Sequence, residues 1–518
     1  MVVAAYQEDS VESEINGNQS DNSATNAGAA YVFVRSGNSW VQQAYLKPYN
    51  PNAFDTFGFS VAISGDSIVI GAVEEDSIAT GVNGDGSNNS RSMSGAAYVF
   101  VRSGTNWIQQ AYLKASNTGS GDLFGYSVAI SSNTIAVGSL YEDSDAVGVN
   151  GDQNNNNAPN SGAAYVFVRN ETNWIQEAYL KASNTRRGGQ FGCSIAISGE
   201  TILVGAYGDS SGAAGVNGDQ NDTSMPGAGA AYVFVRNGTS WSQQAYLKAS
   251  NPGSGDWFGL FVAISEDTAV VGSPFEDSSA TGVNSNGSDN SANDSGAAYV
   301  FTRIGTAWNS QAYLKASNPT GGAPGAFIGG DNFSIVAIFG DKILVGAPGE
   351  SSQAKGINGD QFNEGSTNSG AVYLFGRSGT NWTQEAYLKA SNAGPNDGFG
   401  ISVAASHNTF VVGASFESSN ATGVNGDEGN DLVPTSGATY VFTQFIDEIR
   451  LIISIDGSSG FFLRSTVAPQ TTCRLQRALS PSGRWDTIAT LTAPTSGQIE
   501  YHEASTPDGQ SFYRVVQP

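Results

Sequence analysis

GAAYVFVRNETNWIQEAYLK, at residues 162–181, consists of two runs of alternating apolar and polar side chains joined at 170–173. The runs are rich in Val, Tyr, Phe and Trp, which favour strands, and the Asn-rich junction favours a turn. Upstream, FGYSVAIS at 124–131 and TIAVGS at 134–139 have the same character, and a long polar stretch follows them. The unit from 122 to 184 therefore predicts four antiparallel strands, with no competing helical periodicity.

This unit is repeated along the chain about every 67 residues. The tryptophan of the fourth strand recurs at Trp40, Trp107, Trp174, Trp241, Trp308 and Trp382. The last interval is longer because a Gly/Pro-rich insertion lies at 321–330. A small sheet cannot bury both faces alone, so the copies must stack, and radial stacking of four-stranded sheets gives a β-propeller. Five complete and two partial copies predict an all-β fold with a seven-bladed β-propeller at 1–445.

The repeated motif FGxSVAI followed by VVGA resembles the FG-GAP repeat of integrin α-subunit propellers and of many bacterial surface proteins. The resemblance covers about residues 1–443, and it implies a seven-bladed propeller. Integrin-type repeats often carry a calcium loop between FG and GAP, whereas this chain has a tight turn there, as at 64–66. The acidic, Asn-rich loop instead follows GA, as in bacterial relatives of the motif.

The first copy of the repeat lacks its first strand. MVVAAYQEDS aligns with IVIGAVEEDS, so Met1 stands in the place of Ile68. The missing strand would bury about four apolar side chains, worth about 6–12 kcal/mol. We therefore expect that the sequence starts at an internal methionine of a longer protein, which would also carry the signal peptide. The alternative is a genuine start at Met1, with another segment in the place of the missing strand.

The end of the chain has a different pattern from the repeats. The seventh copy stops after ATYVFTQF, without its Trp and AYLK. Six short apolar segments follow and predict a small β-sandwich at 446–518. Its last part, from CRLQRALSPSGRW to FYRVV, resembles the immunoglobulin- or fibronectin-III-like modules that end many bacterial secreted proteins. In the alternative, EIRLIISI at 448–455 completes the last blade as its fourth strand.

The composition excludes several classes of function. Lys and Arg number 23 against 47 Asp and Glu, and the formal net charge of −24 argues against nucleic acid and anionic membranes as partners. No apolar run is long enough for a membrane span, so no membrane insertion is expected. Only His407 and His502 are present, neither recurs, and no nucleophile elbow, HExxH or phosphate loop exists. We expect no catalytic residues and no enzymatic activity.

The polar loop after GA repeats an acidic residue, an asparagine and a second carboxylate or amide. These residues are Glu75, Asn83 and Asp85; Glu142, Asn150 and Asp152; Asp209, Asn217 and Asp219; Glu350, Asn358 and Asp360; and Glu417, Asn425 and Asp427. Ca²⁺ takes six to eight oxygen ligands, so each loop can supply three side chains and backbone carbonyls. The alternative is a solvated turn network, because Asn-Gly-Asp is a favoured turn and Asx side chains bond their own backbone.

Other recurring side chains also have two interpretations. The lysine of AYLK and the arginine after YVF can form an anion-binding ring, or can pair with nearby carboxylates and shield sheet edges. The tryptophans can stack on sugars, or can pack between outer strands. The loops themselves hold few aromatic residues, namely Tyr6, Tyr141, Tyr207, Phe275, Phe362 and Phe416.

Strand direction alternates within each sheet, so the long loops and the inter-sheet linkers must leave from the same face. Long loops on one face of a repeat protein are the usual place for binding. We therefore expect a monomeric, non-catalytic binding or adhesion scaffold, secreted or on the cell surface, with a protein or glycan ligand and possible calcium stabilisation. The alternatives are a carbohydrate-binding, lectin-like propeller and an accessory propeller of a larger secreted enzyme.

Overall fold

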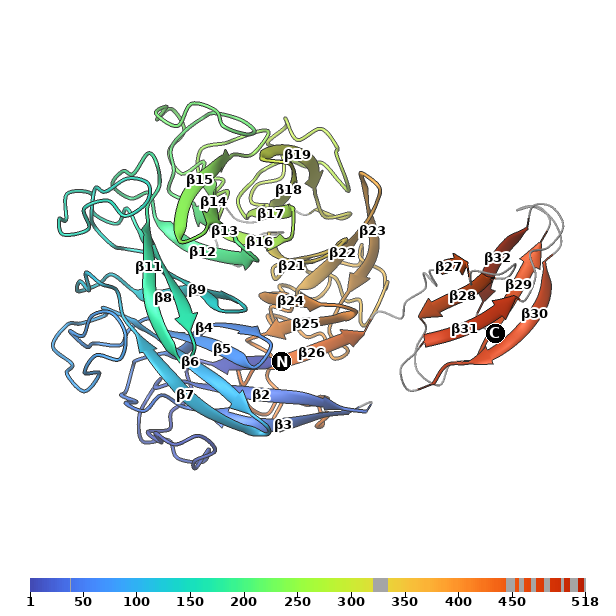
Figure 1. Cartoon of the computed structure of the whole chain (residues 1–518), viewed down its shortest axis with the longest axis horizontal. Helices are drawn as coiled ribbons and strands as arrows, with labels where there is room; N and C mark the ends of the chain where they lie inside the picture. Colours follow the sequence, from blue (N-terminus) through green and yellow to red (C-terminus); the bar gives the residue numbers. More distant parts are fainter. Residues whose placement is uncertain are drawn as a thin grey trace. The chain divides into compact units, whose positions relative to one another are not determined.

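A computed structural model describes residues 1–37, 39–319 and 334–443, and in the C-terminal part 452–455, 461–466, 472–478, 485–494, 498–503 and 511–516. Every regular element in these residues is a strand, so the predicted all-β class is confirmed (Figure 1). The chain divides into two compact units. One comprises Met1–His407 and Val411–Val441, and the other comprises Asn408–Phe410 and Phe442–Pro518.

The described residues of the first unit form five four-stranded and two three-stranded sheets, which we number one to seven in chain order. Sheets one to three consist of β1 (Val2–Ala5), β2 (Ala29–Ser36), β3 (Ser39–Leu46); β4 (Phe57–Ser64), β5 (Ser67–Ala72), β6 (Ala96–Ser103), β7 (Asn106–Leu113); and β8 (Phe124–Ser131), β9 (Thr134–Ser139), β10 (Ala163–Asn170), β11 (Asn173–Leu180). Sheets four and five consist of β12 (Phe191–Ser198), β13 (Thr201–Ala206), β14 (Ala230–Asn237), β15 (Ser240–Leu247); and β16 (Phe261–Ser265), β17 (Thr268–Ser273), β18 (Ala297–Ile304), β19 (Ala307–Leu314). Sheets six and seven consist of β20 (Ile335–Phe339), β21 (Lys342–Ala347), β22 (Ala371–Ser378), β23 (Asn381–Leu388); and β24 (Ser402–Ser406), β25 (Thr409–Ala414), β26 (Ala438–Thr443).

Each complete sheet is a meander of antiparallel strands in chain order, as the alternating pattern predicts. In the second sheet, Val69 lies opposite Val99, and Tyr98 lies opposite Tyr112. The register shifts between Phe57 and Ser60 on β4, where Gly58 has a φ of +97°. This positive φ is a conformation that glycine adopts at little cost. The FG motif therefore forms an irregular start to the inner strand, and the same shift occurs at the start of β8 and β12.

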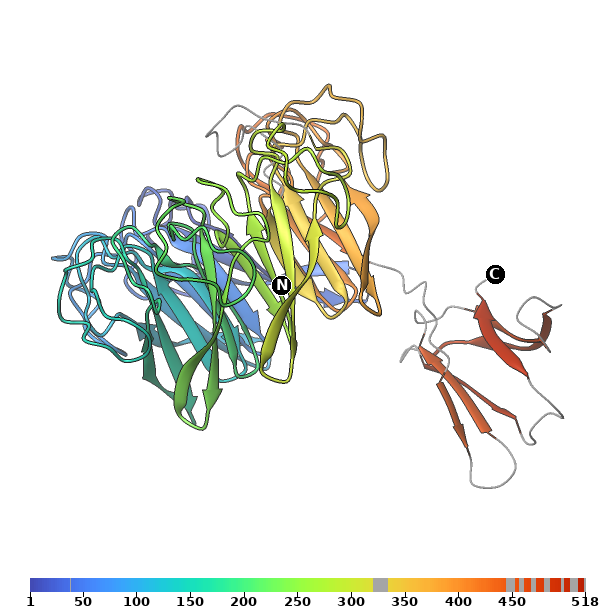
Figure 2. The same cartoon turned by 90° about the horizontal axis from the view of Figure 1, so that it is seen from above.

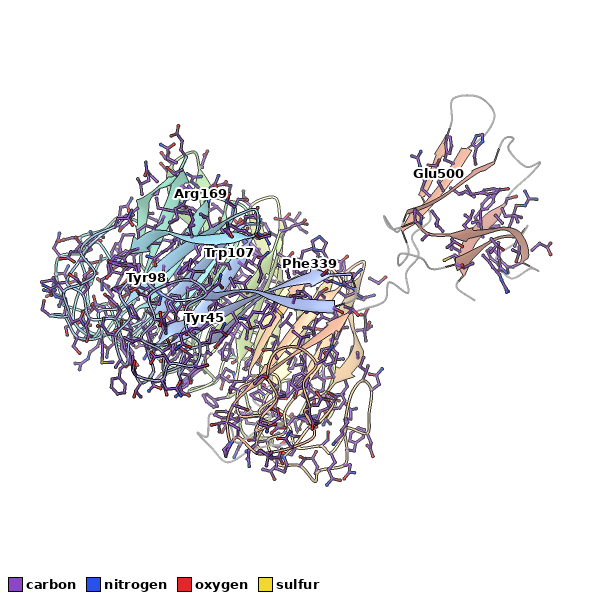
Figure 3. The ribbon with its side chains drawn as sticks, turned by 90° about the horizontal axis from the view of Figure 1, so that it is seen from below. Tyr45, Tyr98, Trp107, Arg169, Phe339 and Glu500 are labelled. Carbon is purple, nitrogen blue, oxygen red and sulfur yellow. The ribbon has the colours of Figure 1, made fainter. Side chains whose placement is uncertain are left out.

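Neighbouring sheets pack an aliphatic face against an aromatic face. At the first interface, Ala30, Val32 and Leu46 of the first sheet share a core with Phe57, Tyr98, Phe100 and Trp107 of the second. Figure 3 labels Tyr98 and Trp107. The ring of Phe57 meets those of Tyr98 and Phe100 edge to face, with centroids 5.4 and 6.0 Å apart. Such aromatic pairs contribute about 0.5–1.5 kcal/mol each beyond the area that they bury. Equivalent cores join the next four pairs of sheets.

The sheets are arranged around a common centre, as in a β-propeller (Figure 1). The long connections from the second to the third strand of each sheet gather along one side, which we call the loop face (Figure 2). Tight hairpin turns such as 65–66 and 104–105 lie along the other side, the turn face. The repeated four-stranded sheets of the predicted propeller are thus confirmed, whereas its count of seven closed blades stays a prediction.

The incomplete first and last sheets agree with the sequence alignment. β1 pairs with β2 in the register with which β5 pairs with β6, since Val2 lies opposite Val32 and Val69 lies opposite Val99. β1 is therefore a second strand, at the edge of a three-stranded sheet. In the seventh sheet the order is β24-β25-β26. The described part of the segment EIRLIISI, β27 (Ile452–Ile455), pairs with β28 (Phe461–Thr466) and not with the seventh sheet, whereas residues 448–451 lie outside the described residues.

The described residues of the C-terminal unit form two three-stranded antiparallel sheets. They are β27-β28-β31 and β30-β29-β32, with β29 (Thr472–Ala478), β30 (Asp486–Thr492), β31 (Gln498–Glu503) and β32 (Phe512–Val516). Leu463 and Leu475, from different sheets, share one buried cluster. That this unit is an immunoglobulin- or fibronectin-III-like sandwich stays a prediction. Among the described residues, no helix is long and apolar enough to cross a membrane.

Candidate functional site

The loop face is held in place by a buried ion pair in each of the first six sheets. In the second sheet, the Glu75 and Lys114 side chains have no exposed surface, and Lys114 Nζ lies 2.7 Å from Glu75 Oε2. Tyr112 donates its hydroxyl to Glu75 Oε1 at 2.7 Å, and Lys114 also donates to Ser94 Oγ at 2.8 Å. We call Glu75, Tyr112 and Lys114 the loop anchor. Its copies pair Glu8 with Lys47, Glu142 with Lys181, Asp209 with Lys248, Glu276 with Lys315, and Glu350 with Lys389.

Burial and pairing act in opposite directions on the loop anchor. Burial lowers the pKa of the Lys114 ammonium, whereas the neighbouring Glu75 carboxylate favours its charged form. The loop begins at the carboxylate and β7 ends just before the lysine, so the pair ties the loop to the fourth strand. A buried pair of this kind contributes little net stability, but either charge is costly once its partner is removed.

An asparagine in each linker joins neighbouring sheets. Asn117, which follows β7, donates to Glu142 Oε1 and to the Gln153 carbonyl, both at 2.9 Å, and accepts the Tyr165 hydroxyl. It thereby connects the second sheet to the anchor carboxylate of the third. Copies of this residue are Asn50, Asn184, Asn251, Asn318 and Asn392. Sequence reasoning missed these asparagines, although their 67-residue recurrence was a usable signal.

The predicted calcium residues of the complete sheets each have a protein partner. Glu75 is in the loop anchor. Asn83, with φ of +56°, accepts the Tyr112 N–H at 2.9 Å. Asp85 is exposed and accepts the N–H of Ser87 at 2.9 Å in an Asx turn. The other predicted sets repeat this placement: Asn150, Asn217 and Asn358 cap the fourth strand, and Asp152, Asp219, Asp360 and Asp427 form Asx turns.

Two of the predicted calcium residues differ from their copies because the seventh sheet has no described fourth strand. Glu417 accepts hydrogen bonds from Asn392 and Ser419 instead of a lysine, and Asn425 is exposed. In the described part of the chain, no group of three His, Cys, Asp or Glu residues could hold a metal ion. Glu75 is engaged inside the loop anchor whereas Asp85 lies at the surface, and a calcium role of these loops stays a prediction.

A second buried carboxylate lies beside several loop anchors, two residues before FG. Asp122 accepts the Gly119 N–H at 2.8 Å, and burial, followed by repulsion from Glu142, raises its pKa to about 7. Burial likewise raises the pKa of Asp55 and of Asp256 to about 7. Asp331, which the sequence pattern also includes, lies outside the described residues.

These raised pKa values give a testable pH dependence. Between about pH 4 and 7 the folded protein keeps protons on Asp122 that the unfolded chain loses, so this residue's contribution to stability falls as the pH rises. We expect Asp122→Asn to raise the free energy of unfolding at pH 8 by about 1–3 kcal/mol, and to have little effect at pH 4. Urea titrations at both pH values measure this difference. Asp85→Asn is the control. The exposed Asp85 carboxylate has a lowered pKa, so its replacement should not raise the free energy of unfolding at pH 8. Equal effects of Asp122→Asn at pH 4 and pH 8 would contradict the account.

Aromatic side chains follow one another along the inner rim of the loop face, where the second strands end and the FG motifs begin. Phe59 lies between Tyr6 and Tyr126, with centroid distances of 5.9 and 5.2 Å. Trp257 lies between Tyr207 and Phe275, with centroid distances of 4.9 and 4.6 Å. Half-buried Tyr126, Tyr141 and Tyr207 pack on one small cluster around Leu140 and Cys193. We call Tyr6, Phe59, Tyr126, Tyr141, Tyr207, Trp257 and Phe275 the inner aromatic arc.

The repeated arginines and tryptophans are used within the sheets. Arg102 pairs with Asp66 across the turn, and its guanidinium lies 5.5 Å from the ring centroid of Trp107. Trp107 is only 5% exposed, and Trp174, Trp241, Trp308 and Trp382 are similarly buried, so the predicted outer-strand packing is confirmed. The lysines are buried in the loop anchors. Apart from Arg35, which donates to the Gly37 carbonyl, the recurring cations have carboxylate or aromatic partners, as the alternative to an anion-binding ring predicted.

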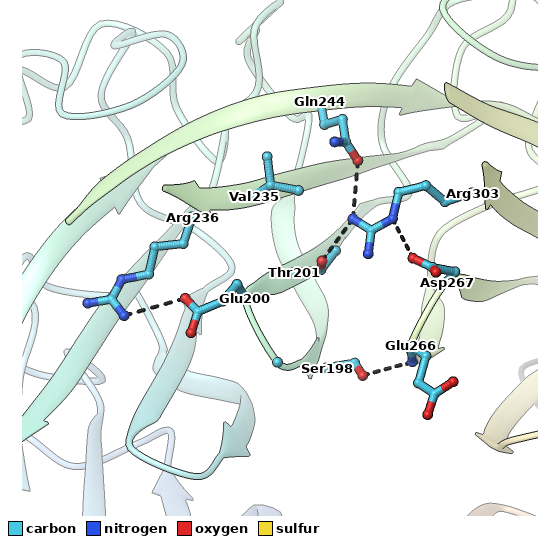
Figure 4. Close-up of a pocket in the computed structure, with 10 residues that line it drawn as sticks. Ser198, Glu200, Thr201, Val235, Arg236, Gln244, Glu266, Asp267 and Arg303 are labelled. Carbon is cyan, nitrogen blue, oxygen red and sulfur yellow. Dashed lines mark hydrogen bonds and ion pairs between the residues drawn. The ribbon is translucent and has the colours of Figure 1, made fainter. Parts of the chain in front are cut away.

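A shallow depression on the turn face is lined by the same kind of paired residues (Figure 4). Arg303 donates to Asp267 Oδ1 at 2.6 Å and to Thr201 Oγ1 at 3.0 Å. Arg236 lies 3.4 Å from Glu200 and 2.6 Å from Glu177. The two arginine charges are satisfied within the protein, so neither is left to hold an anion, and we regard the loop face as the better candidate for binding.

Comparison with protein families gives five matches to the FG-GAP repeat. They cover residues 40–100, 107–167, 174–234, 241–301 and 382–442. Each match starts on the last strand of one sheet, which is β3 in the first sheet, and ends on the third strand of the next sheet. Each matched segment therefore spans an interface between sheets. No curated protein matches the sequence.

One match among solved structures comes from a study of two prolyl endopeptidases. It is 9% identical, with a TM-score of 0.37, and the alignment covers 86% of this chain and 53% of that one. This chain thus spans about half the length of that relative.

Proposed function

This chain belongs to the FG-GAP repeat family, and from that membership and the geometry of the loop face we propose that it is a non-catalytic binding scaffold, secreted or displayed on a cell surface. Its ligand would be a protein or a glycan. The observation that carries the proposal is the repeated loop anchor: six buried ion pairs hold the bases of long polar loops on one face, while the loop tips stay exposed. Preorganised loops lose less conformational entropy on binding than mobile ones.

The test compares the two faces of the molecule. We would screen the purified chain against a glycan array and a panel of immobilised extracellular proteins, and then measure the affinity of each hit for variants. A loop-tip variant carries Asp85→Ala, Asp152→Ala and Asp219→Ala, and the matched turn-face control carries Asp66→Ala and Asp267→Ala. We expect at least tenfold weaker binding for the loop-tip variant alone. Equal loss in both variants, or loss only in the control, would refute the loop face as the binding surface.

A carbohydrate ligand is the second candidate, and the inner aromatic arc favours it. Tyr6 and Phe59 are 42% and 40% exposed, and their rings can offer apolar faces to a sugar at the rim of the loop face. We expect the double variant Tyr6→Ala and Phe59→Ala to lose binding to a glycan found on the array. Phe362→Ala is the control, because this ring is 69% exposed but is not part of the arc. A glycan that binds both variants alike would exclude stacking on the arc.

Calcium stabilisation of the loops is retained as a further proposal. It would rest on exposed tip carboxylates such as Asp85 and on backbone oxygens, since Glu75 is engaged by Tyr112 and Lys114. With millimolar CaCl₂ in place of EDTA, we expect a higher melting temperature and measurable binding heat in calorimetry, because binding to the folded state alone stabilises it. An unchanged melting temperature together with no binding heat would remove calcium from the account.

A further inference from the structure

The linker between the third and fourth sheets differs in charge from the other linkers. In the preceding linker, Gly119 and Asp122 stand five and two residues before the phenylalanine of FG, and the same positions here hold Arg186 and Gly189. A Cβ built on Gly119 would lie 2.5 Å from Asp122 Oδ2. Gly189 has no side chain, which leaves room for Arg186. With Arg187 next in the chain, this linker has two arginines where its neighbour has a carboxylate.

Arg186 keeps an uncompensated positive charge on the loop face. Its guanidinium donates to the backbone carbonyls of Asn184, Gln220 and Asp222, at 3.4, 2.7 and 3.2 Å. Within the described part of the chain, it pairs with no carboxylate. A guanidinium has five N–H groups, so one N–H on each Nη remains free. Arg187 is exposed and also has no carboxylate partner among the described residues, although the formal net charge of the chain is −24.

A depression of about 300 Å³ lies beside Arg186, and we call it the arginine depression. It is lined by Val147 from the loop of the third sheet, by Asn184, Thr185 and Arg186 from the linker, and by Asn221 and Thr223 from the loop of the fourth sheet. Val147 is 55% exposed. The side chains of Asn221 and Thr223 are exposed and bond to no described residue. The volume is at the lower end of that of small-molecule pockets, roughly 300–1,000 Å³.

We propose that the arginine depression binds a sugar unit that carries a carboxylate, such as a uronate. The inference rests on the proposed function of the loop face and names the class of its ligand. The two free N–H groups of Arg186 hold the two carboxylate oxygens in charge-assisted hydrogen bonds. Val147 packs against the apolar face of the sugar ring, while the Asn221 amide and the Thr223 hydroxyl bond the ring hydroxyls.

The charges around the depression favour an acidic ligand over a neutral one. The nearby carboxylates of the fourth loop are held within that loop: Asp219 accepts the Asn221 N–H at 2.9 Å, and Asp222 accepts the Gly212 N–H at 2.7 Å. They therefore leave the Arg186 charge to a ligand, and a neutral sugar would not use it. An acidic peptide offers the same carboxylate but lacks the ring hydroxyls, so we take it as a competing outcome of the test.

The experiment uses the full chain and two matched probes, trigalacturonate and its methyl ester. Titration calorimetry in EDTA measures binding, so that calcium cannot bridge the carboxylates of sugar and protein. We expect saturable binding of trigalacturonate that weakens with added salt. The ester should bind at least about tenfold more weakly, because it has lost the charge-assisted hydrogen bonds.

Variants of the chain locate the site. Arg186→Gln should weaken the binding of trigalacturonate at least about tenfold, because it removes the charge. Arg91→Gln is the matched control, since this loop arginine donates to the Thr118 carbonyl and does not line the depression, and it should bind normally. If Arg186→Gln lowers the melting temperature, Val147→Asp replaces it. That change puts a repelling carboxylate at an exposed position and leaves the hydrogen bonds of Arg186 in place.

Several results would overturn the inference. They are no saturable binding of trigalacturonate, equal binding of acid and ester, full binding by Arg186→Gln or by Val147→Asp, and binding of a triglutamate peptide through Arg186 while trigalacturonate does not bind. The proposed function is tested separately. If trigalacturonate fails while a ligand from the array still depends on the loop tips, this inference falls and the proposed function stands. Trigalacturonate binding that needs Arg186, with no ligand sensitive to the loop tips, would give the reverse result.

Discussion

Gly95→Ala should destabilise the protein by about 4 kcal/mol or more, a loss at the upper end for single substitutions. Gly95 has a φ of +76°, which an alanine adopts only with strain. A Cβ there would also lie 2.1 Å from the Phe124 oxygen and 2.5 Å from its nitrogen. Neither backbone atom can move unless the second and third sheets separate. Urea denaturation followed by tryptophan fluorescence measures the loss.

Gly104→Ala separates the two causes of that loss. Gly104 has a φ of +64°, but nothing lies within 4 Å of the Cβ position in its hairpin turn. This control should cost only about 1 kcal/mol, the price of the backbone conformation alone. If the two variants were equally stable, Gly95 would not mark a close approach between sheets, and the packing described above would be wrong.

Lys114→Met should cost about 3–5 kcal/mol, because it leaves the Glu75 carboxylate buried without its cation. Tyr112 would still donate to Glu75 Oε1, but Oε2 would lose its charged partner. The double variant Glu75→Leu and Lys114→Met removes both charges and should recover most of the stability, since apolar residues of similar volume often replace buried pairs without loss. The double variant should, however, release the loop at 73–95, which faster proteolysis of that loop would detect.

An exposed pair provides the comparison for Lys114→Met. The Asp66 side chain is 64% exposed where it pairs with Arg102, so Asp66→Asn should cost no more than about 1 kcal/mol. If Lys114→Met were as mild as Asp66→Asn, or if the double variant were no more stable than the single one, the loop anchor would not be a buried ion pair.

The strands could be predicted from the sequence because each depends on local pattern. Period-two alternation and the turns between strands located β8 to β11, and the alignment of Met1 with Ile68 gave the register of β1. The segment EIRLIISI was ambiguous, because an apolar strand can complete either of two sheets, and the sequence alone could not predict that residues 452–455 pair with β28.

The candidate site was harder to predict because it depends on side chains far apart in the sequence. Glu75 and Lys114 are 39 residues apart, and the sequence suggested calcium for one and an anion for the other. The structure places them in a single buried ion pair, in which each charge neutralises the other. Recurrence identified the residues correctly but could not give their partners, since a duplicated ion pair and a duplicated ligand set repeat in the same way.

The sequence showed four members of the inner aromatic arc as loop residues, namely Tyr6, Tyr141, Tyr207 and Phe275, but could not assemble the arc, because its members come from several positions of the repeat. Phe59 and Tyr126 come from the third position of the FG motif, whereas Tyr207 follows GA and Trp257 precedes FG. These positions meet only because the first strand begins where the second strand ends, at the inner rim. A search for period 67 finds the anchors but not a surface assembled from several positions.

Distances between spin labels test the central claim, that the anchored loops all lie on one face and the hairpin turns on the other. Cys193 and Cys473 are buried, so introduced cysteines can be labelled selectively. Asn89→Cys and Asn156→Cys mark two loop tips, and Thr105→Cys marks a turn. The 89–105 distance should exceed the length of an eight-residue strand, about 26 Å, and should be longer than the 89–156 distance between neighbouring loops. An 89–105 distance shorter than the 89–156 distance would place loops at both ends of the sheets and contradict the account.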